Sequence, residues 1–170
     1  MPTVEPNDDF IHMDVCIGRL GNCHRTLLSV KADQSHPLAG PAFQFALVDY
    51  CTVFTASQAA DKSRRWLEEK MVPDELQELH RRILGTRNQQ LAHADMSILD
   101  GVIAFQEFEG RLMTTTTMNH VDPLAELRNL DDIVLLVEHV LSSLFVSRRT
   151  RLEALRSFNP SQPMPCRYRL

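Results

Sequence analysis

The segment LRNLDDIVLLVEHVLSSLFVSRR, residues 127–149, decides the fold class of this chain. Its apolar residues recur every three or four positions, which predicts a helix with a heptad-like apolar stripe. Additional aliphatic residues widen the apolar surface, so we expect the helix to face both its own bundle and a second surface, such as another subunit. The stripe consists of Leu127, Leu130, Val134, Val137, Leu141 and Leu144, and the additional residues are Leu124, Ile133, Leu136 and Val140.

Three further helices are predicted before this one. Pro41 suits the first turn of the second helix. Asp74 and Glu75 place acidic side chains at the N-terminus of the third helix, where the helix dipole is positive. Together these signals predict an all-α, antiparallel four-helix bundle. The predicted helices span residues 8–32, 41–70, 73–95 and 122–158.

A small β-hairpin is predicted between the third and fourth helices, at about 101–119. VIAFQEF and RLMTTTTM are rich in residues that favour strands, and they are joined at Glu109-Gly110, where glycine suits a tight turn. We therefore expect one helical domain over 1–158 that contains this hairpin. The proline-containing end, 159–170, is expected to be an irregular basic tail.

The composition is that of an ordinary globular protein, with 44% hydrophobic and 24% charged residues. The acidic N-terminus has no apolar signal region, and no run reaches the length of a membrane span, so we expect a cytoplasmic protein without a membrane-bound segment. The cysteines include no Cys-x-x-Cys pair, which favours buried thiols over a zinc or redox site. The cysteines are Cys16, Cys23, Cys51 and Cys166.

The histidines outside the central motif are expected to be structural or solvated. His12 and His24 lie near Cys16 and Cys23, but no further ligand completes a metal set, so we expect core thiols and surface histidines. We expect His80 on a solvated helix face and His139, which is flanked by aliphatic residues, in the core. No metal or cofactor is predicted.

The C-terminal part of the chain is basic, although the whole chain carries a net charge of -4. From Arg148 onward, six arginines accompany a single acid, Glu153. Two interpretations remain open. Arg148, Arg149 and Arg151 could bind RNA phosphates, or they could form a solvated helix end that complements the helix dipole.

TRNQQLAHAD, residues 86–95, is the most distinctive polar segment. If the third helix continues through it, Arg87 falls on the core-facing stripe of Leu79 and Ile83, where a guanidinium needs anionic or carbonyl partners. Alternatively, Gly85 ends the helix and Thr86 caps a new turn, which places Arg87 at a helix start. The sequence alone leaves both geometries open.

Arg87, Asn88 and His93 are residue types that suit metal-independent cleavage of RNA. Attack of a 2′-hydroxyl on the adjacent phosphorus needs proton transfer, which histidine performs near neutral pH. It also needs stabilisation of a crowded, negatively charged phosphorane, to which arginine can bind with two hydrogen bonds. Asn88 could hydrogen-bond a phosphate, a hydroxyl or the imidazole, and Asp95 could orient His93 or cap the turn after the helix.

Arg87-Asn88 followed by Leu91-Ala92-His93 and Asp95, at the end of a third helix, resembles the HEPN superfamily, especially its abortive-infection branches. The resemblance is specific over about ten residues, and the hairpin is not part of the minimal family pattern. It implies a metal-independent endoribonuclease with Arg87 and His93 as the catalytic pair and Asn88 in support.

The same resemblance implies a homodimer that forms one composite cleft from two motifs, RNA as the substrate, and a toxin or phage-defence role with an antitoxin or regulatory protein as a partner. The alternative is a non-catalytic dimerisation or protein-binding module. This alternative stays open because some HEPN domains have no demonstrated cleavage activity. In that case Arg87 and His93 belong to a structural polar cluster.

Overall fold

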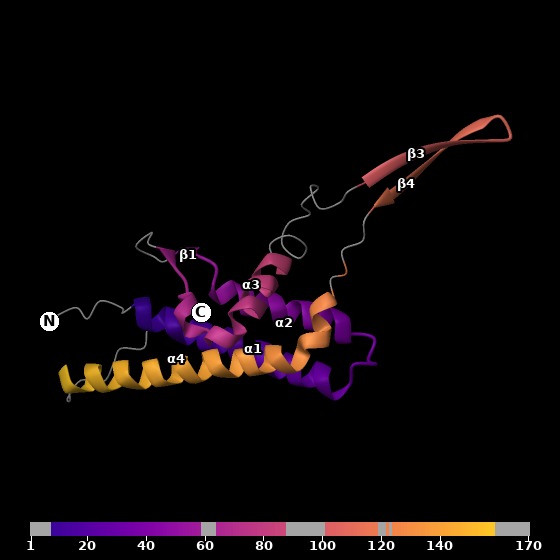
Figure 1. Cartoon of the computed structure of the whole chain (residues 1–170). Coiled ribbons are helices and arrows are strands. Elements are labelled where there is room, and N and C mark those ends of the chain that lie inside the picture. The colour runs from indigo at the N-terminus through magenta and orange to yellow at the C-terminus, as the bar shows by residue number, and fades with distance from the viewer. Residues whose placement is uncertain (1–7, 59–63, 88–100, 119–121, 123, 159–170) are drawn as a thin grey trace, which may run out of the picture.

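The structure, a computed structural model, describes residues 8–58, 64–87, 101–118, 122 and 124–158. It contains four helices and an antiparallel two-stranded hairpin between the third and the fourth, as predicted (Figure 1). The predicted tail at 159–170 lies outside the described residues. The helices are α1 (Asp8–Ala32), α2 (Ala39–Val53), α3 (Gln77–Thr86) and α4 (Leu130–Phe158).

Helices α1 and α4 lie side by side and run in opposite directions (Figure 1). Three ion pairs join them in reverse sequence order. The pairs are Lys31 Nζ to Asp131 Oδ1 at 2.6 Å, His24 Nε2 to Glu138 Oε1 at 2.9 Å, and Arg148 Nε to Asp14 Oδ1 at 2.6 Å. Because all six side chains are at least partly exposed, these pairs fix the register of the two helices more than they add stability.

The wide apolar surface of α4 is buried inside the chain's own bundle. Ile133, Leu136 and Val140 are completely buried, and Leu124 packs against the core beside Gly40. The expectation that these residues serve a second surface is therefore wrong, because they belong to the core of the single chain or pack against it. Among the residues of α4 whose side chains the structure describes, the large apolar ones that are exposed are Leu135, Phe145 and Val146.

Helix α2 ends at Val53, so the prediction of a helix over 41–70 is wrong in its second half. The Leu67 amide donates to the Val53 carbonyl at 2.9 Å, and the Leu67 side chain is buried. The returning chain thus satisfies a carbonyl at the helix end and places an apolar residue in the core. The returning segment includes β1 (Ser57–Gln58), β2 (Arg64–Arg65) and a 3-10 turn at Glu69–Met71.

The third helix begins with a 3-10 turn at Asp74–Leu76 and continues through Gly85. The backbone of Arg87 is also helical, with φ -60° and ψ -48°. Among the described residues, Gly110 is the glycine with positive φ, so Gly85 does not adopt the left-handed conformation of a helix stop. The interpretation with a new helix start at Thr86 is wrong, and the continuous helix is confirmed as far as Arg87.

The fourth helix is preceded by a 3-10 turn at Ala125–Asn129 and extends to Phe158, close to the predicted span of 122–158. The Asp122 carboxylate accepts the Leu124 amide at 2.8 Å. Glu126 lies in the 3-10 turn, where it pairs with Arg82 of α3. This contact positions the third helix against the start of the fourth.

The predicted hairpin is confirmed as β3 (Gly101–Phe108) and β4 (Arg111–Met118). Glu109 and Gly110 form its turn, both with positive φ, as a tight hairpin turn of the type I′ kind requires. The hairpin projects away from the helices (Figure 1). Its described side chains are exposed, including Phe105 and Leu112, so they add nothing to the bundle's core.

Candidate functional site

Arg87 ends the core-facing stripe of α3, as the continuous-helix interpretation predicted. Leu79 and Ile83 of this stripe are buried, and Arg87, one turn after Ile83, is half-buried. Asn88, His93 and Asp95 lie outside the described residues. Of the predicted catalytic set, the structure therefore places Arg87.

The buried thiol of Cys51 on α2 lies within electrostatic range of Arg87. Cys51 Sγ donates to the Ile83 carbonyl at 3.6 Å, which holds α2 against the last turns of α3. Burial raises the pKa of the Cys51 thiol to about 12, and the positive charge of Arg87 offsets part of that rise. The guanidinium thus lies at the edge of the core, within electrostatic range of a neutral thiol.

An ion pair with a buried carboxylate joins α3 to the start of α4. Arg82 Nε donates to Glu126 Oε1 at 3.0 Å, and Asn129 Nδ2 donates to Glu126 Oε2 at 2.6 Å. Burial acts to raise the pKa of Glu126, but the hydrogen bonds from Arg82 and Asn129 outweigh it and lower the pKa. Sequence reasoning missed this pair, which fixes α3 about one turn before Arg87.

His80 is completely buried, so the expectation of a solvated helix face is wrong. Its Nδ1 and the Tyr50 hydroxyl are hydrogen-bonded at 2.8 Å, and the ring packs edge-on against Phe54 with the centroids 4.5 Å apart. Burial lowers the pKa of His80, so the imidazole is neutral at pH 7. A sequence signal was present, because His80 follows Leu76 by four positions and shares its apolar face.

His139 is exposed on α4, so the expectation of a core histidine is also wrong. It occupies the outer surface of the helix, between the fully buried Val137 and Val140. Aliphatic neighbours in sequence do not bury a helical residue when its own angle around the helix points outward.

We expect acidification to destabilise the fold through His80. Below about pH 6.5 the unfolded chain binds a proton at this imidazole, whereas the folded chain does so only at lower pH. The contribution of the neutral His80 imidazole to the free energy of unfolding is therefore fully present above about pH 6.5. It is lost as the pH falls from there through the lowered pKa of His80 in the folded chain. The check is the melting temperature of the wild type and of His80→Gln across this range, which should fall less steeply in the variant.

His12 is the necessary comparison for this prediction, because burial and then Arg65 lower its pKa as well. The His12→Gln variant removes that contribution while leaving His80 in place. Equal pH slopes for the wild type and His80→Gln, with a reduced slope for His12→Gln, would show that His80 is not the responsible group.

The predicted core thiols are confirmed for Cys16, Cys23 and Cys51, which are buried and reduced. His12 and His24 are half-buried rather than fully on the surface. His12 Nε2 lies 3.7 Å from Cys16 Sγ. Within the described residues, no group of three histidine, cysteine or acidic side chains is arranged to hold a metal ion.

The three arginines predicted to contact RNA differ in their surroundings. Arg148 pairs with Asp14, and its guanidinium lies 5.4 Å from the centroid of the Phe10 ring. This arginine is therefore occupied in joining α4 to α1. Arg149 is exposed, and Arg151 lines a cavity beside the start of α1.

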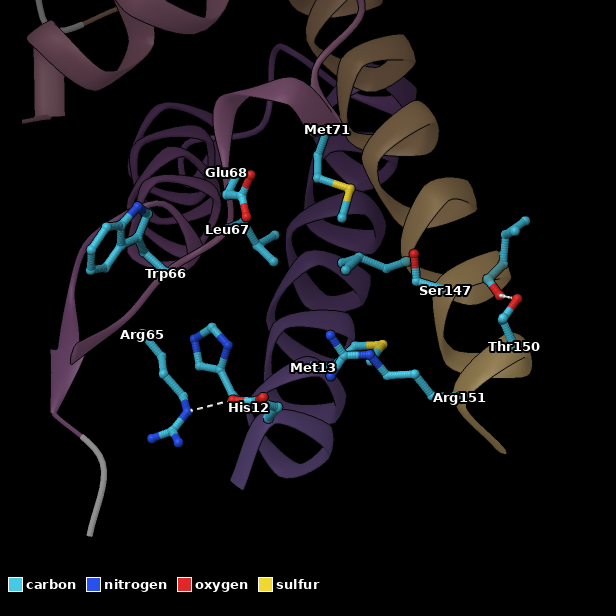
Figure 2. A pocket seen from close by; sticks show the side chains of 13 residues that line it. His12, Met13, Arg65, Trp66, Leu67, Glu68, Met71, Ser147, Thr150 and Arg151 are labelled. Atoms are coloured by element: carbon cyan, nitrogen blue, oxygen red, sulfur yellow. Dashed lines mark hydrogen bonds and ion pairs between the residues drawn. The ribbon is translucent and has the colours of Figure 1, made fainter. Parts of the chain in front are cut away.

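That cavity has a volume of about 720 Å³ (Figure 2). It lies between α1, the end of β2 with the residues that follow it, and α4. The sequence did not predict it, because its walls come from three separate parts of the chain. It is lined by Asp9, His12, Met13, Arg65, Trp66, Leu67, Glu68, Met71, Leu144, Val146, Ser147, Thr150 and Arg151.

Comparisons of this chain with models of known families, with curated proteins and with solved structures found no match. Within the part of the chain that the structure describes, no helix is both long enough and apolar enough to cross a membrane.

Proposed function

We propose that this protein is a metal-independent endoribonuclease of the HEPN type. In this proposal Arg87 and His93 are the catalytic residues, Asn88 supports them, and Asp95 orients His93. The enzyme acts on RNA as a homodimer, in the role of a toxin or phage-defence effector that an antitoxin or regulatory protein restrains.

The chemistry assigned to these residues is transfer of a phosphodiester to the neighbouring 2′-hydroxyl. The O2′–P bond forms while the P–O5′ bond breaks, which leaves a 2′,3′-cyclic phosphate and a 5′-hydroxyl. One proton leaves the 2′-hydroxyl and one reaches the 5′-oxygen, so protons balance. His93 transfers a proton, and Arg87 stabilises the charge on the phosphorane oxygens with its two-pronged guanidinium.

The observation that carries the proposal is the position of Arg87 at the end of the core-facing stripe of α3. An arginine in this position keeps its charge at every working pH, and its partial desolvation strengthens its attraction for an anion. The hydrogen-bonded pair of Arg82 and Glu126 restrains the helix that carries Arg87.

The same partial burial favours a second candidate function. If Arg87 serves to hold α3 against α2, near Cys51, the segment is a structural cluster in a non-catalytic dimerisation or protein-binding module. The two functions differ in what loss of the side chain changes: RNA cleavage in the first case, and thermal stability in the second.

Mixing two inactive variants tests the enzyme and its composite cleft together. Arg87→Ala and His93→Ala are purified separately, and their subunits are exchanged by mild denaturation and refolding. Where a site combines Arg87 of one subunit with His93 of the other, each mixed dimer regains one intact site, so cleavage returns to a substantial fraction of the wild-type rate.

Each alternative gives another result in this experiment. Sites contained within single subunits leave the mixture as inactive as the two variants. If light scattering shows that the chain is monomeric, the proposed homodimer is wrong. If either variant cleaves RNA at the full rate before mixing, the substituted residue is not catalytic.

A further inference from the structure

The hairpin of β3 and β4 receives no support from the bundle. It projects away from the helices (Figure 1), and its side chains from Val102 to Thr116 are exposed. Among the described residues, no third strand pairs with it. An isolated two-stranded hairpin is only marginally stable in water, and three or more strands are needed for independent stability. Pairing with further strands would therefore stabilise the hairpin.

The free edge of β4 has none of the features that usually prevent strand pairing. Natural proteins protect exposed edges with charged residues, prolines or bulges. The register between β3 and β4 is uninterrupted from one end to the other, so β4 contains no bulge. Its residues 112–118, LMTTTTM, include no charge and no proline, whereas β3 carries Glu107. The β4 edge is thus open to the addition of another strand.

The turn determines which backbone groups of β4 point to this edge. The two-residue turn at Glu109-Gly110 makes the residues that flank it the first hydrogen-bonding pair of the hairpin. Every second residue after Arg111 therefore directs its backbone amide and carbonyl away from β3. These residues are Leu112, Thr114, Thr116 and Met118.

The sequence of β4 is complementary to a second copy of itself. When a two-fold axis relates two antiparallel strands, residues equally far from the axis are opposite each other. With the axis at Thr115, Thr114 is opposite Thr116 of the partner subunit, and both direct their backbone groups outward. Thr115 is opposite its own counterpart, and threonine pairs of this kind stabilise antiparallel sheets.

The charges of the hairpin are compatible with this pairing. The charged residue of β4 is Arg111, which lies beside the turn. In the antiparallel pair the turn of one hairpin lies at the open end of the other. The two copies of Arg111 are therefore about 27 Å apart, several times the screening length in physiological salt. No like charges are brought together.

We propose that two copies of this chain pair along β4, with the two-fold axis at Thr115, and form one antiparallel four-stranded sheet. The pairing buries on the order of 600 Å² in total, less than the roughly 1,200 Å² at which stable interfaces begin, so by itself it is reversible on dilution. The hairpin is not part of the minimal HEPN pattern, so the resemblance does not imply this contact. It forms whether or not the chain cleaves RNA.

Cysteine cross-linking of the full chain tests the pairing and its register. In Thr115→Cys the two thiols belong to a non-hydrogen-bonded pair with Cα atoms about 4.5 Å apart, within disulfide range. Met113→Cys is the matched control, because it is exposed on the same face but its counterpart lies about 14 Å away along the strands. Both variants carry Cys166→Ser, since the other cysteines are buried. Diamide serves as the oxidant and accepts the two electrons and two protons that each disulfide releases.

We expect most of the Thr115→Cys chain to shift to twice its mass on a non-reducing gel, and Met113→Cys to stay at the background level. Equal cross-linking of both variants would show random collision. Absence of cross-linking in Thr115→Cys would show that the two β4 edges do not meet. Either result overturns the proposal.

Proline on either edge identifies the strand that pairs. Thr116→Pro removes an amide on the free edge of β4, and Ile103→Pro removes one at the same position of the β3 edge. Within the Thr115→Cys variant, Thr116→Pro should abolish cross-linking and Ile103→Pro should leave it unchanged. Loss in both, or in Ile103→Pro alone, would overturn the assignment to β4.

Two further measurements keep these results interpretable. Because the hairpin adds nothing to the core, both proline variants should keep the helical circular dichroism and the melting temperature of the wild type. RNA cleavage is measured in parallel. Cross-linking without cleavage would remove the proposed enzyme and keep this interface, and cleavage without cross-linking would do the reverse.

Discussion

RNA cleavage is expected to fall by about 10²–10⁴-fold when His93 is replaced by alanine, with the fold retained. Arg87→Ala should lose about 10²–10³-fold, because a preorganised donor no longer stabilises the phosphorane charge. Arg87→Lys should recover only part of the loss, since an ammonium keeps the charge but not the two-pronged geometry. The measurement is the initial rate of cleavage of a labelled transcript, together with the melting temperature of each variant.

Exposed residues of the same types serve as controls. Arg81 is exposed on α3, two turns before Arg87, and His139 is exposed on α4. Arg81→Ala and His139→Ala should cleave at the wild-type rate. A marked fall in melting temperature for Arg87→Ala, without any RNA cleavage by the wild type, would favour the structural cluster over the enzyme.

Leu136→Ala is expected to destabilise the fold by about 2–5 kcal/mol, which corresponds to a fall in melting temperature on the order of 5–15 °C for a chain of this size. Leu136 is completely buried between helices, so its truncation loses apolar burial and leaves a cavity. Thermal or denaturant unfolding followed by circular dichroism measures this loss.

Leu135→Ala is the matched control, because the same residue type occupies the next position of the same helix but is 45% exposed. We expect a change within about 0.5 kcal/mol. A large loss that depends on protein concentration would show instead that Leu135 is buried between subunits. Such a result would place a dimer interface on the outer face of α4.

Much of the fold could be predicted because local signals and tertiary packing agree. The periodic apolar residues of α4 and the Glu109-Gly110 turn each have one structural solution. The second half of the predicted helix over 41–70 failed for the opposite reason. Leu67 could satisfy a helical pattern equally well, and its burial beside the end of α2 depends on a contact with Val53 that no local pattern contains.

The candidate sites were less predictable than the fold. The place of Arg87 on the core stripe was one of two geometries that the sequence left open, and the structure shows this one. By contrast, His80 is buried by Tyr50, which lies 30 positions earlier in the chain. The cavity beside Trp66 requires three segments from both ends and the middle of the sequence, so only the folded chain brings its residues together.

The most direct test of the proposed function is the chemistry of the RNA ends that the purified protein produces in excess chelator. The proposal predicts 2′,3′-cyclic phosphate and 5′-hydroxyl ends from the wild type, identified by mass spectrometry, and neither from His93→Ala. Ends with 5′-phosphate, products that require an added metal ion, or identical products from His93→Ala would contradict it.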